Sequence, residues 1–318
     1  MRDIFNSLDL PILSASIKAR VTRDIRWNSF PGSVVHGVLG FKLKNLSCVV
    51  SHRNCRRCYV VHTCSYGTIY ESPLPPDTKR MRLYPQAPHP IRIAVYPWDR
   101  PELKTSETFE VVIVLMGKAV TNSLLLILSL DGALKEGVGR KYGGERGRAE
   151  IISLKDRISG KEKEWKDLKD DYSDFISAVA LKNLKRSKKA GDIAVHIRSP
   201  LKIITDGKSN FNPSLRDITS TLLRRLSNLS YFYNEKEIPL DYQSLLSKAE
   251  SSPYSSEFKK VGAIRYSSRQ SKTISMGGIT GKMTIESCVP EISALLDVGV
   301  HIGLGKGTTM GLGDYSVL

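Results

Sequence analysis

The pattern of hydrophobic and polar positions predicts the same order of elements twice. Alternating or fully apolar short runs predict strands, and apolar residues spaced three or four apart predict helices. In the first half the order is strand, helix, strand, strand, helix, strand, over residues 14–24, 31–46, 91–98, 108–117, 122–136 and 148–154. The second half repeats it over residues 192–203, 214–229, 262–270, 274–286, 290–302 and 314–318. This order predicts an α+β fold of two tandem ferredoxin-like (RRM-like) βαββαβ domains.

The length of the chain fits this division, because 318 residues suffice for two domains of about 150 residues each. We expect an N-terminal domain at residues 1–154, which carries a Cys-rich loop at 48–64. A charged connecting segment follows at 155–190, and a C-terminal domain with a glycine-rich loop occupies 191–318.

The last helix of each predicted domain is followed by a glycine-rich stretch. "GVGRKYGGERGRAEIISL" starts at Gly137 and "HIGLGKGTTMGLGDYSVL" at His301. When the two stretches are aligned at a constant offset of 166 positions, three glycines align with glycines and one cation aligns with a cation. The aligned pairs are Gly137 with Gly303, Gly139 with Gly305, Gly147 with Gly313, and Arg140 with Lys306. Ordering so many glycines costs conformational entropy, so we expect the stretch to have a role that compensates for this cost. It could be a disordered tail, a phosphate-cradling loop or a surface that another backbone approaches closely.

The element order argues against a phosphate-cradling loop of the kind that binds nucleotides. A Walker-type loop follows a strand and opens a helix, whereas here the helix comes first, which disfavours ATP or NAD. We therefore expect an exposed cationic ribbon of backbone N–H groups suited to a nucleic-acid backbone. RNA contacts are expected to concentrate on the C-terminal copy, with Lys306 on a phosphate, and the first copy to be structural or secondary.

Charge points to a polyanionic partner. Lys and Arg number 48 against 32 Asp and Glu, a formal net charge of +16, and residues 1–64 hold ten of these cations against three acids. Nucleic acid is the first expectation and an acidic membrane surface the second. No apolar stretch reaches the roughly 18 residues that a membrane span needs, and the start of the chain lacks a secretory-signal pattern. We expect a cytoplasmic protein that is not bound to a membrane.

Four of the five cysteines lie within seventeen residues, with the spacing Cys48-x6-Cys55-x2-Cys58-x5-Cys64. Thiolates are good zinc ligands, and in a cytosolic chain a metal site outranks disulfides. A zinc ion held by four thiolates would be structural. Arg53, Arg56 and Arg57 in the same loop are candidates for RNA binding, and the fifth cysteine, Cys288, is expected to be a small buried residue.

Several stretches together resemble the CRISPR-associated pre-crRNA processing endoribonucleases of the RAMP superfamily. They are "FPGSVVHGVLG" from Phe30, the Cys-rich stretch from Cys48, "RSPLKI" from Arg198, "RYSSRQSKTISMGGITGKM" from Arg265 and the glycine-rich end from His301. The resemblance implies cleavage of CRISPR repeat RNA by attack of a 2′-hydroxyl on the neighbouring phosphate, which leaves a cyclic phosphate and uses no catalytic metal. CRISPR repeat RNA, the mature guide RNA and subunits of a CRISPR effector complex are the implied partners of a monomer or homodimer.

Such a reaction needs a base, an acid and cations around the phosphorane. On the first predicted helix, His36, Gly40 and Lys44 share a stripe, opposite a buried stripe of Val35, Leu39, Leu43 and Leu46. The small and charged neighbours would leave room for a phosphate beside His36. We expect His36 to be the general base or acid, with Lys44 or Lys42 stabilising the phosphorane. A surface histidine without a role is the alternative.

Two further stretches are candidates for RNA binding rather than chemistry. On the strand predicted at 262–270, Arg265, Ser267 and Arg269 would share one face, and Gln270 would lie on the other. Around the terminal loop the candidates are His301, Gly303, Gly305, Lys306, Thr308, Thr309, Gly311 and Gly313. Two rival functions stay open, a guide-RNA-binding protein of the same fold that does not cut, and a zinc-stabilised RNA-binding module unrelated to CRISPR.

Overall fold

The computed structural model describes residues 8–51, 54–168, 172–184, 191–267 and 271–318. The first half contains the predicted order in β1 (Pro11–Arg23), α1 (Pro31–Ser47), β3 (Ile91–Tyr96), β5 (Thr108–Met116), α2 (Ser123–Glu136) and β7 (Glu145–Asp156). The strands lie in the order β3-β5-β1-β7, and neighbours are antiparallel. The first and third strands are therefore central, as a βαββαβ unit requires.

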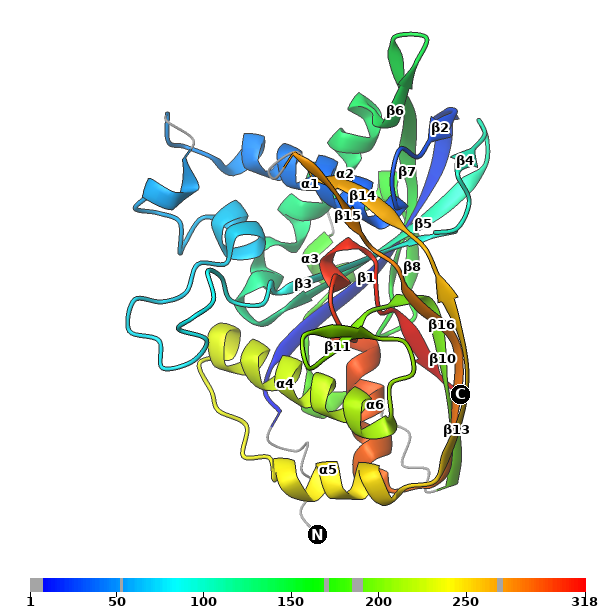
Figure 1. Cartoon of the computed structure of the whole chain (residues 1–318). Coiled ribbons are helices and arrows are strands. Elements are labelled where there is room, and N and C mark those ends of the chain that lie inside the picture. Colours follow the sequence, from blue (N-terminus) through cyan, green and yellow to red (C-terminus); the bar gives the residue numbers. More distant parts are fainter. Residues whose placement is uncertain (1–7, 52–53, 169–171, 185–190, 268–270) are drawn as a thin grey trace.

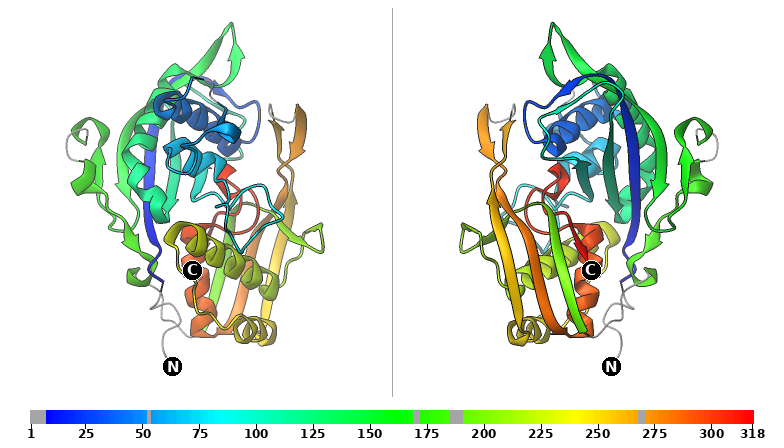
Figure 2. Two further views of the ribbon diagram at one scale, coloured as in Figure 1. Left: turned by 90° about the vertical axis from the view of Figure 1, so that its left-hand side faces the viewer. Right: turned by 90° about the vertical axis from the view of Figure 1, so that its right-hand side faces the viewer.

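The second half has the same topology. Its elements are β10 (Gly191–Leu201), α4 (Leu215–Asn234), β13 (Tyr254–Val261), β16 (Gly278–Cys288), α6 (Pro290–Ile302) and β17 (Tyr315–Val317), with the strand order β13-β16-β10-β17. The start of α4 follows from a capping box, in which the Ser214 hydroxyl accepts from the Asp217 amide and the Asp217 carboxylate accepts from the Ser214 amide. The two halves are stacked, with the first above the second (Figure 2).

Smaller elements extend this frame. They are β2 (Ile25–Arg26), β4 (Glu102–Leu103), β6 (Val138–Tyr142), β8 (Glu162–Glu164), α3 (Tyr172–Phe175), β9 (Val179–Ala180), β11 (Ile203–Thr205), β12 (Lys208–Asn210), α5 (Tyr242–Ser251), β14 (Ile264–Ser267) and β15 (Lys272–Ser275). Two of them project as hairpins, β6 with the start of β7 at the top of Figure 1, and β14 with β15 across α1. The residues after β7 stay with the first sheet, because β8 pairs with β7 and β9 with β1.

One strand was assigned wrongly from sequence. The second strand of the second sheet is β13, at Tyr254–Val261, and not residues 262–270. Outward side chains such as Glu257 and Lys259 give β13 a polar appearance because the outer face of this sheet carries no helix (Figure 2, right). The more apolar Ile264–Ser267 forms the separate β14–β15 hairpin instead.

A continuous core joins the two halves. Val112, Val114 and Met116 of the first sheet belong to the same buried cluster as Leu222 and Leu226 of α4. A second cluster lies between the first sheet and helices α1 and α2. Both faces of the first sheet are therefore buried along part of its length, which explains the uninterrupted apolar run of β5. No helix among the described residues is long and apolar enough to cross a membrane.

Candidate active site

The proposed catalytic histidine lies on α1, which begins at Pro31. The His36 side chain is partly buried, and its ring lies 4.7 Å from the Tyr70 ring, centroid to centroid. The Tyr70 hydroxyl donates a hydrogen bond of 3.1 Å to the His36 carbonyl oxygen. Tyr70 is itself stacked on Tyr66 at 5.4 Å. The aromatic pair thus fixes one side of the histidine.

Burial holds His36 in its neutral form. Burial, with smaller contributions from His89 and Arg265, lowers the pKa of the imidazole to about 3. Arg265 comes from β14 of the second half, so the site combines residues of both halves. A neutral imidazole is the form that can accept a proton.

The two lysines expected beside His36 are directed elsewhere. The Lys42 ammonium forms an ion pair with Glu136 on α2. The Lys44 ammonium lies over the Tyr66 ring, 5.1 Å from its centroid, and Lys44 is eight residues beyond His36, about 12 Å along the helix. The structure therefore does not bring either lysine next to the imidazole.

The space expected beside His36 is filled. A Cβ on Gly40 would lie 2.5 Å from a ring carbon of Tyr70, so the glycine admits this aromatic ring and leaves no room there for a phosphate. The predicted buried stripe is correct for Val35, Leu39 and Leu43. It is wrong for Leu46, which is 52% exposed because α1 extends past the sheet at its last turn.

The C-terminal glycine loop is buried between the halves, so the expectation of an exposed ribbon is wrong for this copy. Of its candidate residues, Gly303, Gly311 and Gly313 are buried, Thr308 and Thr309 are 3% and 8% exposed, and Lys306 is exposed. A short 3₁₀ helix at Thr308–Met310 packs on the start of α1, where a Cβ on Gly32 would lie 2.4 Å from the Met310 carbonyl oxygen. The RNA-binding roles of the loop residues stay predictions.

A buried charge cluster fixes the end of this loop. Asp314, directly after the last glycine, forms ion pairs with Arg92 of β3 and Arg198 of β10 and accepts a hydrogen bond from Tyr96. Arg92 also donates to the Val300 carbonyl oxygen at 2.8 Å, near the end of α6. Since Arg92 belongs to the first half and Asp314 to the second, the cluster joins the halves.

His301 lies behind this cluster rather than on a ligand surface. It is partly buried, and burial with the charges of Arg157 and Arg92 lowers the pKa of its imidazole to about 4. Its Nδ1 atom is buried without a hydrogen-bond partner among the described residues. The role of His301 in RNA binding stays a prediction.

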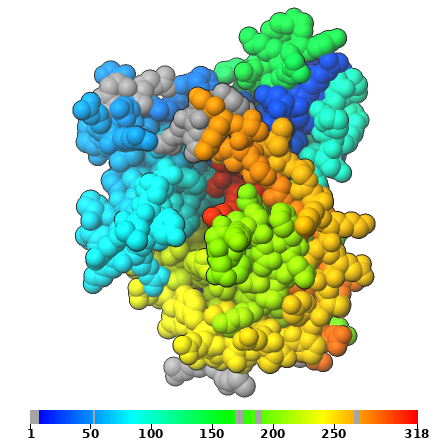
Figure 3. Space-filling view, viewed as in Figure 1, coloured from blue at the N-terminus to red at the C-terminus, as the bar shows by residue number. Residues whose placement is uncertain are grey.

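Lys306 opens onto a cleft of about 630 Å³ between the halves. Its cations are Lys202, Arg224, Arg225 and Lys306, and Met81 and Tyr84 of the first half form part of the opposite wall. In Figure 3 the loop is visible only as a small red patch at the bottom of this hollow. The Lys306 amide donates to the Lys202 carbonyl oxygen at 2.9 Å, which fixes the backbone under the side chain.

The β14–β15 hairpin lies on the N-terminus of α1. The Ile264 carbonyl oxygen accepts from the Phe30 amide at 3.2 Å and from the Ser29 hydroxyl at 2.8 Å. The Nε of Arg265 is buried without a hydrogen-bond partner among the described atoms, and burial lowers the pKa of its guanidinium. Ser267 pairs through its backbone with Lys272, while Arg269 and Gln270 lie outside the described residues.

The four clustered cysteines line one cavity of about 180 Å³ under the end of α1. All have free thiols, and burial raises the pKa of Cys55. Within the described ranges, no three His, Cys, Asp or Glu side chains are arranged to hold one metal ion. Arg56 and Arg57 are exposed beside the cavity, Arg53 lies outside the described residues, and Cys288 is buried as expected.

Sequence reasoning missed the aromatic pair and the charge cluster. The spacing of Tyr66 and Tyr70 by four residues is the signal that could have indicated two rings stacked on one helical face. Arg92 gives a second signal, because a lone arginine in the apolar run "IRIAV" must find a carboxylate when it is buried.

Family models match both halves. One, for an N-terminal domain, covers residues 10–171, and the model for the CRISPR-associated endoribonuclease Cas6 covers residues 195–315. The second half of the chain thus matches the Cas6-type family of CRISPR-associated endoribonucleases. No curated protein sequence matches it.

Solved Cas6 structures share the fold of the whole chain. A Cas6 product complex has 13% sequence identity and a TM-score of 0.59, over 97% of this chain and 99% of that one. Cas6 of Thermus thermophilus has 14% identity and a TM-score of 0.54, again over 97% and 99%. A partial Cas6-RT-Cas1–Cas2 complex also reaches 0.59 at 13% identity, over 99% of this chain and 47% of that one. At these identities the likeness concerns the fold.

Proposed function

We propose that the chain is the endoribonuclease that cuts CRISPR repeat RNA into guide RNA, by metal-independent attack of a 2′-hydroxyl that leaves a 2′,3′-cyclic phosphate. The supporting observation is the position of His36, a neutral imidazole that packs on Tyr70 of the first half and lies within the electrostatic influence of Arg265 of the second. The match of residues 195–315 to the Cas6 family model supports the substrate class.

Three roles follow for these groups. The imidazole of His36 removes the proton of the 2′-hydroxyl or, once protonated, returns one to the leaving 5′-oxygen. Arg265, which cannot lose its proton at neutral pH, stabilises the negative charge on the phosphorane. An RNA phosphate bound on the side of His36 away from Tyr70 would raise its pKa toward neutrality, because an anion favours the imidazolium.

The rival function is a guide-RNA-binding protein that does not cut. It is favoured by one observation, that Lys42 and Lys44 are directed to Glu136 and Tyr66 instead of toward His36. In that case the cleft at Lys306 would hold RNA while no cation served a reaction.

Cleavage of end-labelled repeat RNA in EDTA separates the two functions. One discrete cut with a cyclic-phosphate end supports the enzyme, and tight binding without product supports the rival. His36→Ala should slow single-turnover cleavage by about 10²–10⁴-fold, the usual contribution of a positioned proton transfer, and leave RNA affinity nearly intact. The matched control is His196→Ala, on the exposed face of β10. Wild-type cleavage rates in His36→Ala would place the base elsewhere.

The proposal also includes the location of the protein, its oligomeric state, its protein partners and a structural metal ion. The chain acts in the cytoplasm, as a monomer or homodimer, and passes its product to subunits of a CRISPR effector complex. A structural zinc ion on Cys48, Cys55, Cys58 and Cys64 stabilises the loop at 48–64. The thiols line one cavity but do not converge, so zinc would have to draw the loop closed.

A further inference from the structure

The exposed cationic surface of this protein lies on the first glycine-rich copy. The hairpin of β6 and the start of β7 carries four exposed cations, Arg140, Lys141, Arg146 and Arg148. None of the four makes an ion pair with another described residue. In the buried C-terminal copy, by contrast, the exposed cation is Lys306.

Two glycines of the hairpin allow its base to pack closely against the neighbouring backbone. A Cβ on Gly139 would lie 2.4 Å from the Arg26 carbonyl oxygen, and one on Gly147 would lie 2.5 Å from the Asp24 carbonyl oxygen. Gly143 and Gly144, at the turn, have open space around them. The hairpin is therefore packed tightly where it leaves the sheet and open to solvent at its tip.

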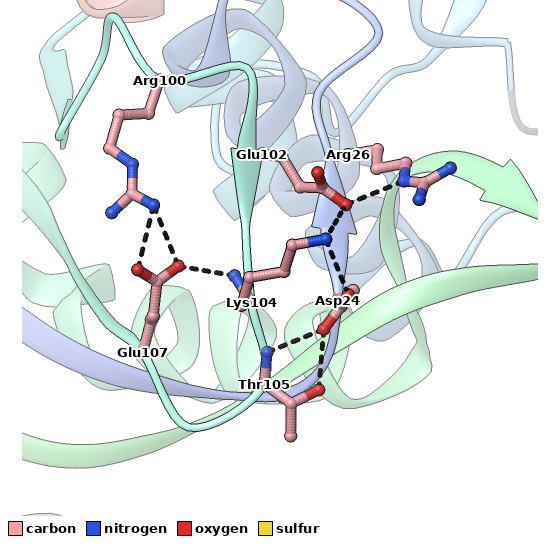
Figure 4. Close-up of polar contacts among 7 residues, drawn as sticks. All are labelled: Asp24, Arg26, Arg100, Glu102, Lys104, Thr105 and Glu107. Atoms are coloured by element: carbon pink, nitrogen blue, oxygen red, sulfur yellow. Dashed lines mark hydrogen bonds and ion pairs between the residues drawn. The ribbon is translucent and has the colours of Figure 1, made fainter.

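An aromatic side chain of the hairpin is held in place by a polar network. Tyr142 is 70% exposed, and the Arg26 guanidinium lies 3.7 Å from its ring centroid. Figure 4 shows how Arg26 is fixed, with its Nε donating to the Glu102 carboxylate at 2.9 Å while Lys104 contacts the same carboxylate at 2.7 Å. One face of the Tyr142 ring is thus covered by a cation and the ring is positioned before any ligand binds.

A groove of about 800 Å³ separates the hairpin from α1. Lys141, Arg146 and Arg148 line it on the hairpin side, and Gly37 and Phe41 line it on the helix side. Phe41 is 67% exposed, an unusual position for a large aromatic residue without a partner. On α1 the groove is lined by the face of Ser33, Gly37 and Phe41, which is a different face of the helix from that of His36.

The carboxylates of the groove do not cancel its charge. Glu136 is paired with Lys42 and Glu145 with Arg23, so both are neutralised by cations other than the three that line the groove. The arrangement of unpaired guanidinium groups opposite the exposed ring of Phe41 fits the phosphates and bases of a nucleic-acid strand. An acidic peptide would match the cations but not the ring.

We propose that the groove between α1 and the β6–β7 hairpin binds single-stranded RNA, with Arg146 and Arg148 on phosphates and with Phe41 stacking on a base. The inference extends the proposed function, on which it rests for the identity of the nucleic acid. It adds a second RNA-binding surface on α1, separate from the cleft at Lys306.

The test is binding of a labelled oligouridine, measured by fluorescence anisotropy at several salt concentrations. We expect Arg146→Ala/Arg148→Ala to weaken affinity roughly tenfold, because two charged contacts are lost. The slope of log affinity against log salt should fall by about 1.4, since each phosphate contact on a single strand contributes about 0.7. Arg146→Lys/Arg148→Lys should keep the wild-type slope.

The matched control is Lys161→Ala/Lys163→Ala, which removes the same charge near the opposite end of β7, beside β8. Its salt slope should equal that of the wild type. Equal affinity and slope in the arginine variant and the wild type would overturn the proposal, as would an equal loss in the lysine control. Because oligouridine lacks the repeat, this result is independent of cleavage. Failure of the proposed function would show as absent cutting of repeat RNA in the wild type.

Discussion

The carbonyl oxygen of Lys202 lies 2.5 Å from the position that a Cβ on Gly305 would take. In the first half, Gly139 stands in the same relation to the Arg26 carbonyl oxygen at 2.4 Å. Both glycines have φ near +80°, and both follow the last helix of their half. The two glycines correspond because, in each half, the backbone that follows the first strand packs directly against the glycine and leaves no space for a Cβ atom.

Gly305→Ala should therefore be strongly destabilising. The substitution combines a positive φ with a clash against backbone, and we expect a loss of about 2 kcal/mol or more in the free energy of unfolding. Urea denaturation measures it. Gly207→Ala is the control, since Gly207 has the same φ of +78° but no atom within 4 Å. Equal losses in the two variants would mean that the close approach contributes nothing.

The elements and their order could be predicted from sequence because strand and helix periods are local properties of the chain. The burial of the C-terminal loop could not. The glycines and the cation of this loop look the same in both copies of the sequence. Only the packing of the two halves determines that Met310 contacts Gly32 in the C-terminal copy, whereas the tip of the first copy stays exposed.

The candidate site shows the same limit. The helical stripe correctly placed His36 next to Gly40, but it predicted open space beside the imidazole, which is partly buried. What fills the space over Gly40 is Tyr70, which lies 30 residues away in the chain on a segment with no clear hydrophobic period. The directions of Lys42 and Lys44 depend on Glu136 and Tyr66, which are also remote in the chain.

The three partly buried histidines should make the protein sensitive to acid. Burial lowers the pKa of His36 to about 3 and those of His89 and His301 to about 4, each from 6.5. The unfolded chain then binds more protons than the folded one, so stability rises with pH between about 4 and 6.5 and is lost as pH falls through that window. At pH 5 each would cost on the order of 2 kcal/mol.

Urea denaturation at pH 5, 6, 7 and 8 measures this loss. His301→Gln should flatten the dependence of stability on pH by up to one proton, whereas His196→Gln, on an exposed strand face, should not change it. A dependence identical in His301→Gln and the wild type would show that His301 is protonated as easily in the folded state as in the unfolded state.

The Cys-rich loop should bind about one zinc ion per chain, as elemental analysis of protein purified without chelator would show. Thiolate ligation would stabilise a loop whose polar, arginine-rich sequence offers little apolar surface to bury. Cys55→Ser should then lose the metal and increase proteolysis within residues 48–64, and Cys288→Ser, at a cysteine outside the loop, should retain it. Metal-free wild-type protein with a protease-resistant loop would contradict the zinc site.

Lys306 should contribute a phosphate contact in the cleft between the halves. Its ammonium is exposed beside Lys202 and Arg224, and its backbone is fixed by the hydrogen bond to the Lys202 carbonyl oxygen. Lys306→Ala should weaken binding similarly for RNAs of different sequence and reduce the salt slope by about 0.7, because a contact to phosphate releases a counterion without reading a base. Lys306→Arg should retain both.

Combined with Arg146→Ala/Arg148→Ala, the loss from Lys306→Ala should be additive in free energy if the cleft and the hairpin groove are separate surfaces on one RNA. An unchanged affinity together with an unchanged slope in Lys306→Ala would remove the cleft from the RNA path. The hairpin groove would then carry the backbone contacts by itself.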